Sequence, residues 1–186
     1  MKNLISSGAG LALLAGLALS AVTWSASPAG QSPPYVFDSK VDLFGYYMPT
    51  ADVKVGKFKL NNLAIGAKDD FKKYLAGERM ATYAPVMIAF DDVTSPQKTN
   101  ETGQPYYENS PRVLPAAFKI SGASVTFAGH DKQLGDVSFS GALAPFMLDP
   151  KFKPEQRAAM SMPALTGNLT VNGKAQKVMF TWFGGD

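Results

Sequence analysis

The side chains that could do acid–base chemistry are few in this chain. His130 is the only histidine, and it stands directly before Asp131 in the stretch FAGHDKQLGD. An imidazole beside a carboxylate has the right residue types for a general base. Its place just after Gly129, where a hairpin turn is expected, predicts a solvated residue instead. We therefore expect no catalytic residue.

Acidic residues occur as two adjacent pairs, Asp69-Asp70 and Asp91-Asp92. Carboxylate oxygens bind hard cations, but adjacent side chains on a strand point to opposite faces. The pairs are expected at a helix start and a strand exit, in contact with water. With one histidine and no cysteine, a multi-histidine or thiolate metal site is excluded by count. No G-x-S-x-G, H-E-x-x-H or phosphate-loop motif occurs, so we predict no enzyme, no metal and no cofactor.

Aromatic side chains are abundant, with twelve Phe, seven Tyr and two Trp. Small antiparallel barrels are either filled by side chains or keep a cavity for one apolar ligand. Five aromatic residues are the candidates for lining such a cavity and binding its ligand: Phe127, Phe139, Phe146, Phe180 and Trp182. An ordinary packed core would use the same residues, so both interpretations stay open.

The segment 91–112 contains three prolines and little hydrophobic periodicity, which predicts a long loop. Loops beyond about 12–15 residues in compact domains are usually functional or disordered. Tyr106 and Tyr107, with Arg112 at the end of the segment, are the candidates for contact with a partner protein. The alternative is that the loop packs back onto the domain.

The first residues read as a targeting segment. One lysine is followed by an apolar run over 8–24 and then by small and proline-rich residues, the layout of a secretory signal peptide. The run also approaches the ~20 residues that span a bilayer, so an uncleaved membrane anchor is the alternative for residues 1–29. Either reading places the protein in the periplasm or on the extracellular side of the membrane, secreted or anchored by this helix. A formal net charge of +3 favours no polyanionic partner such as nucleic acid.

Residues 35–186 predict one all-β domain, a mainly antiparallel barrel or sandwich of about eight strands. Strands are expected over 35–48 with a bend at Gly45, over 53–65 with a bulge at Gly56, and over 83–90, 116–121, 124–129 and 136–143. Two short helical insertions are expected, at 67–80 with Gly77 ending the helix and at 152–160.

The C-terminal stretch LTGNLTVNGKAQKVMFTW predicts a hairpin, because its apolar residues alternate and Asn172-Gly173 suits a type I′ turn. On the last strand Val178, Phe180 and Trp182 share one face. The residues Met179, Thr181 and Phe183 share the other, so we expect this strand to be covered on both sides.

This hairpin resembles the closing hairpin of the YceI-like family, T-G-x-L-T-x-x-G followed by a basic residue and V-x-F. The matching positions here are Thr166, Gly167, Leu169, Thr170, Gly173, Lys177, Val178 and Phe180. The resemblance implies an exported, lipocalin-like eight-stranded barrel whose apolar cavity binds polyisoprenoid or other lipid-like molecules. The histidine and serine usual in the family's first strand are absent around 35–43.

Together these features predict an exported, non-catalytic protein that binds a hydrophobic or lipid-like small molecule. The alternative is a membrane-anchored accessory subunit that docks on a membrane protein complex through the 91–112 loop.

Overall fold

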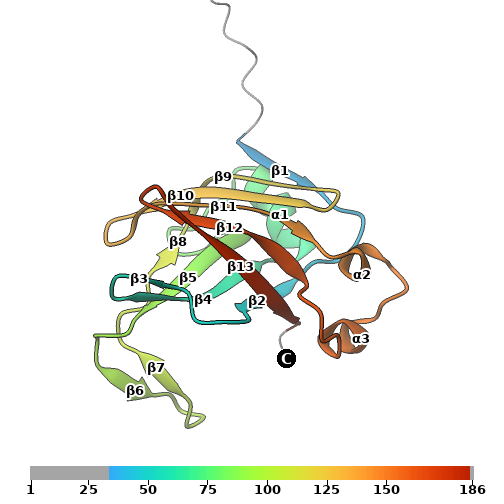
Figure 1. The fold of residues 1–186 in the computed structure, drawn as a ribbon. Coiled ribbons are helices and arrows are strands. Elements are labelled where there is room, and N and C mark those ends of the chain that lie inside the picture. The colour runs from blue at the N-terminus through green and yellow to red at the C-terminus, as the bar shows by residue number, and fades with distance from the viewer. Residues whose placement is uncertain (1–33, 185–186) are drawn as a thin grey trace, which may run out of the picture. The chain divides into compact units, whose positions relative to one another are not determined.

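The computed structural model describes residues 34–184, and this part of the chain is mostly β with few helices (Figure 1). The segment 1–29, predicted to be a signal peptide or a membrane anchor, lies outside the described residues. Within the described range, no helix combines the length and the apolar character needed to cross a membrane.

The elements are short, as expected from the many turn signals in the sequence. The strands are β1 (Tyr35–Asp38), β2 (Gly45–Pro49), β3 (Lys54–Val55), β4 (Phe58–Ile65), β5 (Val86–Asp92), β6 (Gln97–Thr99), β7 (Pro105–Tyr107), β8 (Arg112–Val113), β9 (Pro115–Ser121), β10 (Ser124–Asp131), β11 (Gly135–Leu143), β12 (Leu165–Val171) and β13 (Lys174–Phe183). The helices are α1 (Lys68–Leu75), α2 (Pro145–Leu148) and α3 (Pro154–Ala158).

Eleven of these strands form one sheet, in the order β1-β9-β10-β11-β12-β13-β2-β4-β5-β8 with β3 paired to β4. The strands β6 and β7 pair only with each other. Neighbouring strands are antiparallel except β1, which runs parallel to β9. The mainly antiparallel β fold is thus confirmed. The strand count exceeds the expected eight for two reasons. The strands β3, β6, β7 and β8 are two or three residues long, too short to leave a sequence pattern, and the strand expected over 35–48 is two strands, β1 and β2.

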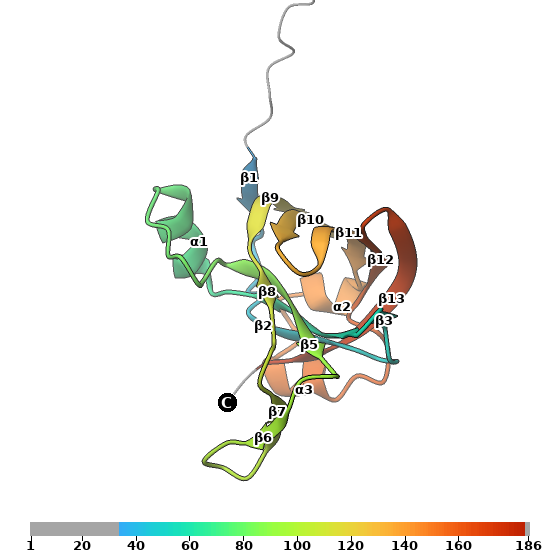
Figure 2. The ribbon, with the colours of Figure 1, turned by 90° about the vertical axis from the view of Figure 1, so that its left-hand side faces the viewer.

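The sheet curls because the chain joins its two ends. The strand β8 stands at one end of the strand order and β9 stands next to the other end, yet only Leu114 separates them in the sequence. Figure 2 shows the chain running from β7 through β8 into β9. The sheet therefore forms a half-barrel with the core on its inner side.

The helix α1 adds aromatic side chains to this core. Its Phe71 stacks on Phe37 of β1 with ring centroids 3.8 Å apart and meets Phe118 of β9 edge-on at 5.6 Å. Its Tyr74 meets Tyr35 edge-on at 5.1 Å. The Asp70 carboxylate accepts the Ala67 backbone N–H at 2.9 Å and so caps the start of the helix. The helix ends before Gly77, as expected, since Gly77 has φ +97°.

The N-terminal strand prediction is wrong in its topology. Instead of one strand over 35–48 that bends, β1 pairs with β9 whereas β2 pairs with β13 and β4. Gly45 starts β2, and a Cβ there would lie 2.5 Å from the Phe183 carbonyl oxygen and 2.6 Å from the Trp182 indole nitrogen. Glycine is needed at this position for close packing as well as for its φ of +142°.

At Gly56 the alternation of inward and outward side chains shifts by one residue. A turn causes this shift, and not the bulge that we expected. Gly56, with φ +60°, lies in the tight turn between β3 and β4, where Val55 pairs with Phe58. A hairpin turn changes the phase of the side chains just as a bulge does. The irregularity in pairing occurs later, between Leu60 and Asn62.

The three-dimensional structure confirms the hairpins predicted in the C-terminal half. Strands β9 and β10 pair in register around Gly122, and β11 occupies the strand expected over 136–143. In the last hairpin Asn172 and Gly173 have φ of +48° and +76°, which suits a type I′ turn. The helix expected at 152–160 is α3, while α2 was not predicted because its four residues, PFML, are too few to show a helical periodicity.

Candidate functional site

The five aromatic residues predicted to bind an apolar ligand are all buried in the core cluster: Phe127, Phe139, Phe146, Phe180 and Trp182. They do not form one group of rings. Phe139 and Phe180 meet edge-to-face at 5.7 Å, and Phe146 instead pairs with Phe152 at 6.1 Å. The Trp182 indole N–H donates to the Phe44 carbonyl at 3.1 Å, which holds the ring against the start of β2.

Two glycines make room for Phe139 inside the half-barrel. Gly141 and Gly167 face each other across β11 and β12, and a Cβ on either would come within 2.6 Å of the Phe139 ring. The ring thus lies over backbone that carries no side chains. Phe139, one of the five predicted ligand-binding residues, is therefore packed closely against the backbone of β11 and β12.

The segment predicted to be a long loop contains the β6–β7 hairpin, which stands out from the half-barrel (Figures 1 and 2). We call residues 94–108 the arm. Tyr106 and Tyr107 follow each other on β7, so their side chains point to opposite faces, and Tyr106 is 46% exposed. Arg112 is not in the arm, because it lies on β8 and pairs with Ala89. Of the three predicted partner-binding residues, the arm therefore contains Tyr106 and Tyr107 but not Arg112.

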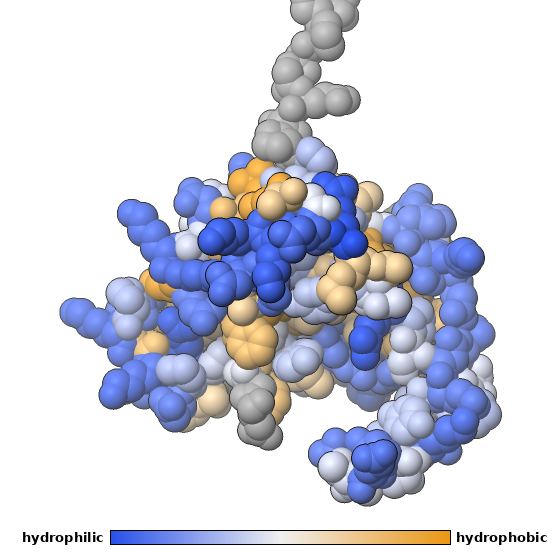
Figure 3. All heavy atoms as spheres, turned by 180° about the vertical axis from the view of Figure 1, so that it is seen from behind, coloured by the Kyte–Doolittle hydropathy of each residue, from blue (hydrophilic) through white to orange (hydrophobic). Residues whose placement is uncertain are grey.

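Figure 3 shows that the arm, at the lower right, is almost entirely hydrophilic. Its two strands are joined by an ion pair between Lys98 and Glu108, with the ammonium 2.6 Å from the carboxylate. At its tip the Asn100 side-chain oxygen accepts the backbone N–H groups of Thr102 and Gln104 and the Thr102 hydroxyl. The arm therefore has a defined shape held by its own polar contacts.

The base of the arm is fastened by Asp92, one of two charged or polar side chains buried in the described residues. Its carboxylate accepts from the Lys57 ammonium at 2.7 Å, from the Thr94 hydroxyl at 2.6 Å and from the Asn109 amide at 3.0 Å. Hydrogen bonds from Lys57, then from Thr94 and Asn109, hold the pKa of this carboxyl well below its ordinary value. The expectation of a solvated acidic pair is thus wrong for Asp92.

A second set of hydrogen bonds joins the arm's base to neighbouring strands. Asn109 and Gln133 exchange amide hydrogen bonds at 2.9 and 3.2 Å. The Ser110 hydroxyl donates to Asp91 at 2.8 Å, and the Asn61 amide donates to the same carboxylate at 2.7 Å. The arm is held from three sides, by the β3–β4 turn, β4 and the β10–β11 turn.

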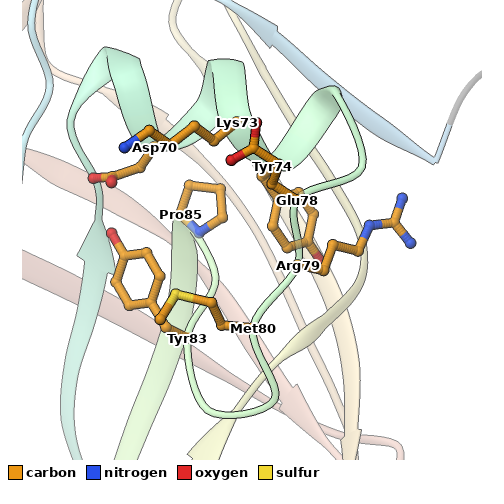
Figure 4. Close-up of a pocket in the computed structure, with 8 residues that line it drawn as sticks. All are labelled: Asp70, Lys73, Tyr74, Glu78, Arg79, Met80, Tyr83 and Pro85. Carbon is orange, nitrogen blue, oxygen red and sulfur yellow. The ribbon is translucent and has the colours of Figure 1, made fainter.

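A recess of about 350 Å³ lies beside α1 and the chain that leads from it to β5 (Figure 4). Its lining mixes apolar and charged side chains: Asp70, Lys73, Tyr74, Glu78, Arg79, Met80, Tyr83 and Pro85. In Figure 4 Met80 lies beside the Tyr83 ring, and Arg79 points its guanidinium away from the recess. That guanidinium lies over the rings of Tyr35 and Tyr74, at 4.7 and 5.2 Å from their centroids.

Two tyrosine hydroxyl groups of this recess have raised pKa values, and two of its charged side chains form no ion pair within the described residues. Burial, and then a hydrogen bond with Asp70, raises the pKa of Tyr83 to about 12. Burial, and then a hydrogen bond with Tyr35, raises the pKa of Tyr74 to about 12. In the described part of the chain, Lys73 and Glu78 form no ion pair. Both phenols stay protonated near neutral pH, and the recess also contains the ammonium of Lys73 and the carboxylates of Asp70 and Glu78.

The remaining candidates are His130, for acid–base chemistry, and the acidic side chains, for metal binding. His130 lies within β10 instead of in the expected turn, and its Nδ1 is 2.8 Å from the Asp136 carboxylate. Both side chains are well exposed. No group of three His, Asp or Glu side chains that could hold a metal ion occurs within residues 34–184.

One buried charge remains, in α3. The Arg157 guanidinium donates to the Asp42 carbonyl at 2.7 Å, and its Nε has no hydrogen-bond partner in the described residues. This contact ties α3 to the chain between β1 and β2, close to the buried Tyr47, whose hydroxyl donates to the Leu43 carbonyl. The role of Arg157 that the structure shows is to hold α3 in place.

Comparison of the chain with protein-family models, with curated proteins and with solved structures finds no match. The resemblance of the last hairpin to the YceI-like family therefore stays a prediction.

Sequence reasoning missed both the Asp92 anchor and the α1 recess. The anchor had one available signal, since an aspartate at an inward position of β5 alternates with Ile88 and Phe90. The recess had none, because it forms where the end of a helix and a following turn come together.

Proposed function

We propose that this chain is an exported, non-catalytic binding protein that docks on another protein through the arm. The observation that carries the proposal is the combination of a projecting hairpin with a base fastened by the buried Asp92. A segment already held in one shape loses little conformational entropy on binding. The proposal corresponds to the accessory-subunit alternative from the sequence.

The side chains of the arm suit a protein partner. Tyrosine is among the residues that contribute most to binding at interfaces, and Tyr106 is 46% exposed. Lys98 and Glu108 flank it with one charge of each sign, which favours a partner that presents polar groups of both kinds.

Photo-crosslinking in the native envelope tests this proposal. A photoreactive amino acid is placed at Tyr106 of the full-length chain and, as control, at Leu75, which has the same exposure of 46% on α1. We expect a discrete protein adduct from position 106 that is absent from position 75. Alanine at Asn109, which loosens the arm's base, should weaken the adduct. Equal labelling at both positions, or none at 106, would contradict docking through the arm.

A second candidate function is the binding of an amphiphilic small molecule, and the recess beside α1 favours it. Its volume of about 350 Å³ is at the lower end of the range for small-molecule sites. The apolar part of a ligand would lie on Met80, Tyr83 and Pro85, and its polar head would reach Lys73 or Glu78. The YceI-like resemblance implies a ligand inside the barrel, but the aromatic core packs there.

The affinity of the chain for a fluorescent fatty acid tests this second candidate function. Arginine at Met80 should fill the recess and weaken binding at least about tenfold, corresponding to ~1.4 kcal/mol. Arginine at Met162, an exposed methionine outside the recess, is the control. Weakening by alanine at Phe180 alone would place the ligand in the interior instead.

A further inference from the structure

The outer face of β2 and β13 carries large apolar side chains that nothing in the described residues covers. Phe183 pairs directly with Tyr46, and Thr181 pairs directly with Met48. Met179 follows on the same face, next to Thr50, whose backbone N–H donates to the Met179 carbonyl. The two-sided covering expected for the last strand is therefore wrong for its outer side. We call Phe44, Tyr46, Met48, Met179 and Phe183 the apolar patch.

The apolar patch continues onto the neighbouring strand β4. Tyr46 pairs with Ala64 of β4, and Ala64 pairs with Met87 of β5, which is buried, so the exposed part of this apolar row ends before β5. A shallow recess of about 120 Å³ beside this row is lined by Phe44, Tyr46 and Met87 among others. The patch is thus a continuous surface rather than a set of scattered residues.

The size of the apolar patch matches a specific protein interface. Its members are 38% to 49% exposed, which for side chains of this size leaves about 450 Å² of apolar surface in water. A standard interface buries about 800 Å² on each partner, somewhat over half of it apolar. The patch therefore supplies the apolar share of one such interface.

We infer that the apolar patch is covered by the same patch of a second copy of this chain. A sheet face packs well on another sheet face, with the strands at a modest angle and the side chains of both in contact. The patch has an aromatic end, with Phe183 and Tyr46, and a methionine end, with Met179, and the pair of Met48 and Thr181 lies between the two ends.

A two-fold axis through the centre of the patch, near Thr181 and Met48, lays the aromatic end of one copy on the methionine end of the other. Sulfur–aromatic contacts of this kind are favourable, and the arrangement is self-complementary, as a two-fold interface must be. The inference is independent of the arm, which would occur twice in the dimer.

Cysteine cross-linking tests the position of the axis. The chain contains no cysteine, so a single introduced thiol gives an unambiguous result. We expect the full-length Thr181→Cys variant to form a disulfide-linked dimer under mild oxidation. Thr170→Cys, on the outer face of β12, is the control and should stay monomeric. Equal cross-linking of both variants would contradict the inference.

Sedimentation velocity measures dimer formation without requiring that two thiols come close enough to form a disulfide. Lysine at Met179 should raise the dimer dissociation constant at least about tenfold, whereas lysine at Thr170 should leave it unchanged. A wild-type chain that stays monomeric up to high micromolar concentration overturns the inference. So does a chain that is monomeric but binds phosphatidylglycerol vesicles in a way that lysine at Met179 abolishes, because the patch would then face a membrane.

Discussion

The outer face of the half-barrel has two halves of opposite character. Over β10, β11 and β12 the side chains that point outward are small and polar: Thr126, Ser138, Ser140, Asn168 and Thr170. Over β13 and β2 they include four large apolar side chains, Phe183, Tyr46, Met48 and Met179, with Thr181 among them. The inner face is apolar under both halves. Packing of the core therefore does not explain why the outer face of β13 and β2 is apolar. A binding surface at this place, in addition to the arm, does explain it.

The largest effect is expected from comparing two phenylalanines on one strand. Phe180 is buried on the inner face of β13 against Phe139, and Phe183 is on its outer face, 49% exposed. Phe180→Ala should lower the free energy of unfolding by about 3–5 kcal/mol. Phe183→Ala should change it by less than about 0.5 kcal/mol in the monomer. Urea denaturation at low protein concentration measures both, and equal losses would mean that the outer half belongs to the core.

The inner face under the polar half depends on its paired glycines. Gly167→Ala should lower the free energy of unfolding by about 1–3 kcal/mol, because the new methyl group would meet the Phe139 ring and the Gly141 backbone. Ser140→Ala, on the outer face of the neighbouring strand, is the matched control and should be nearly neutral. A neutral Gly167→Ala variant would mean that the interior has free space, as a ligand cavity requires.

The pH dependence of stability should trace largely to the one carboxylate buried on the inner side. The pKa of Asp92 is lowered in the folded chain, so its contribution is complete above the unfolded value of about 4 and is lost as the pH falls below it. The denaturation midpoint of the wild type should fall between about pH 5 and pH 2. Asp92→Asn should start lower and fall less, whereas Asp69→Asn, at an exposed site on α1, should follow the wild type.

Substitutions on the polar half should have the smallest effect. Thr170→Lys is expected to change the free energy of unfolding by less than about 0.5 kcal/mol, because the side chain points outward on β12. Its denaturation midpoint and its sedimentation coefficient should both match those of the wild type. A loss of either would show that the polar half is also a contact surface.

The sequence predicted regular, local features best. The hairpin at Asn172-Gly173 follows from two positive-φ residues between alternating strands, and it is present with the expected turn. The end of α1 follows from Gly77 in the same way. The arm was missed because β6 and β7 are three residues each, too short to show an alternating pattern, so their strand character comes from pairing with each other. The parallel pairing of β1 with β9 depends on contacts more than eighty residues apart along the chain, which no local pattern encodes.

The candidate sites were predictable only in part. The sequence left open whether Tyr106 and Tyr107 contact a partner or pack back onto the domain, and the structure places both on the projecting arm. The apolar nature of both sides of β13 was visible in the sequence. The sequence did not show what covers the outer side of β13, because Met179 and Phe183 have the same pattern whether this chain or another molecule packs on them.

Methionine oxidation measured by mass spectrometry tests the central claim most directly. Met48 and Met179 lie in the apolar patch, and Met80 and Met162 are exposed elsewhere. With increasing concentration of the full-length chain, the account predicts that Met48 and Met179 become protected from oxidation while Met80 and Met162 do not. Oxidation of all four at rates that do not depend on protein concentration would contradict it.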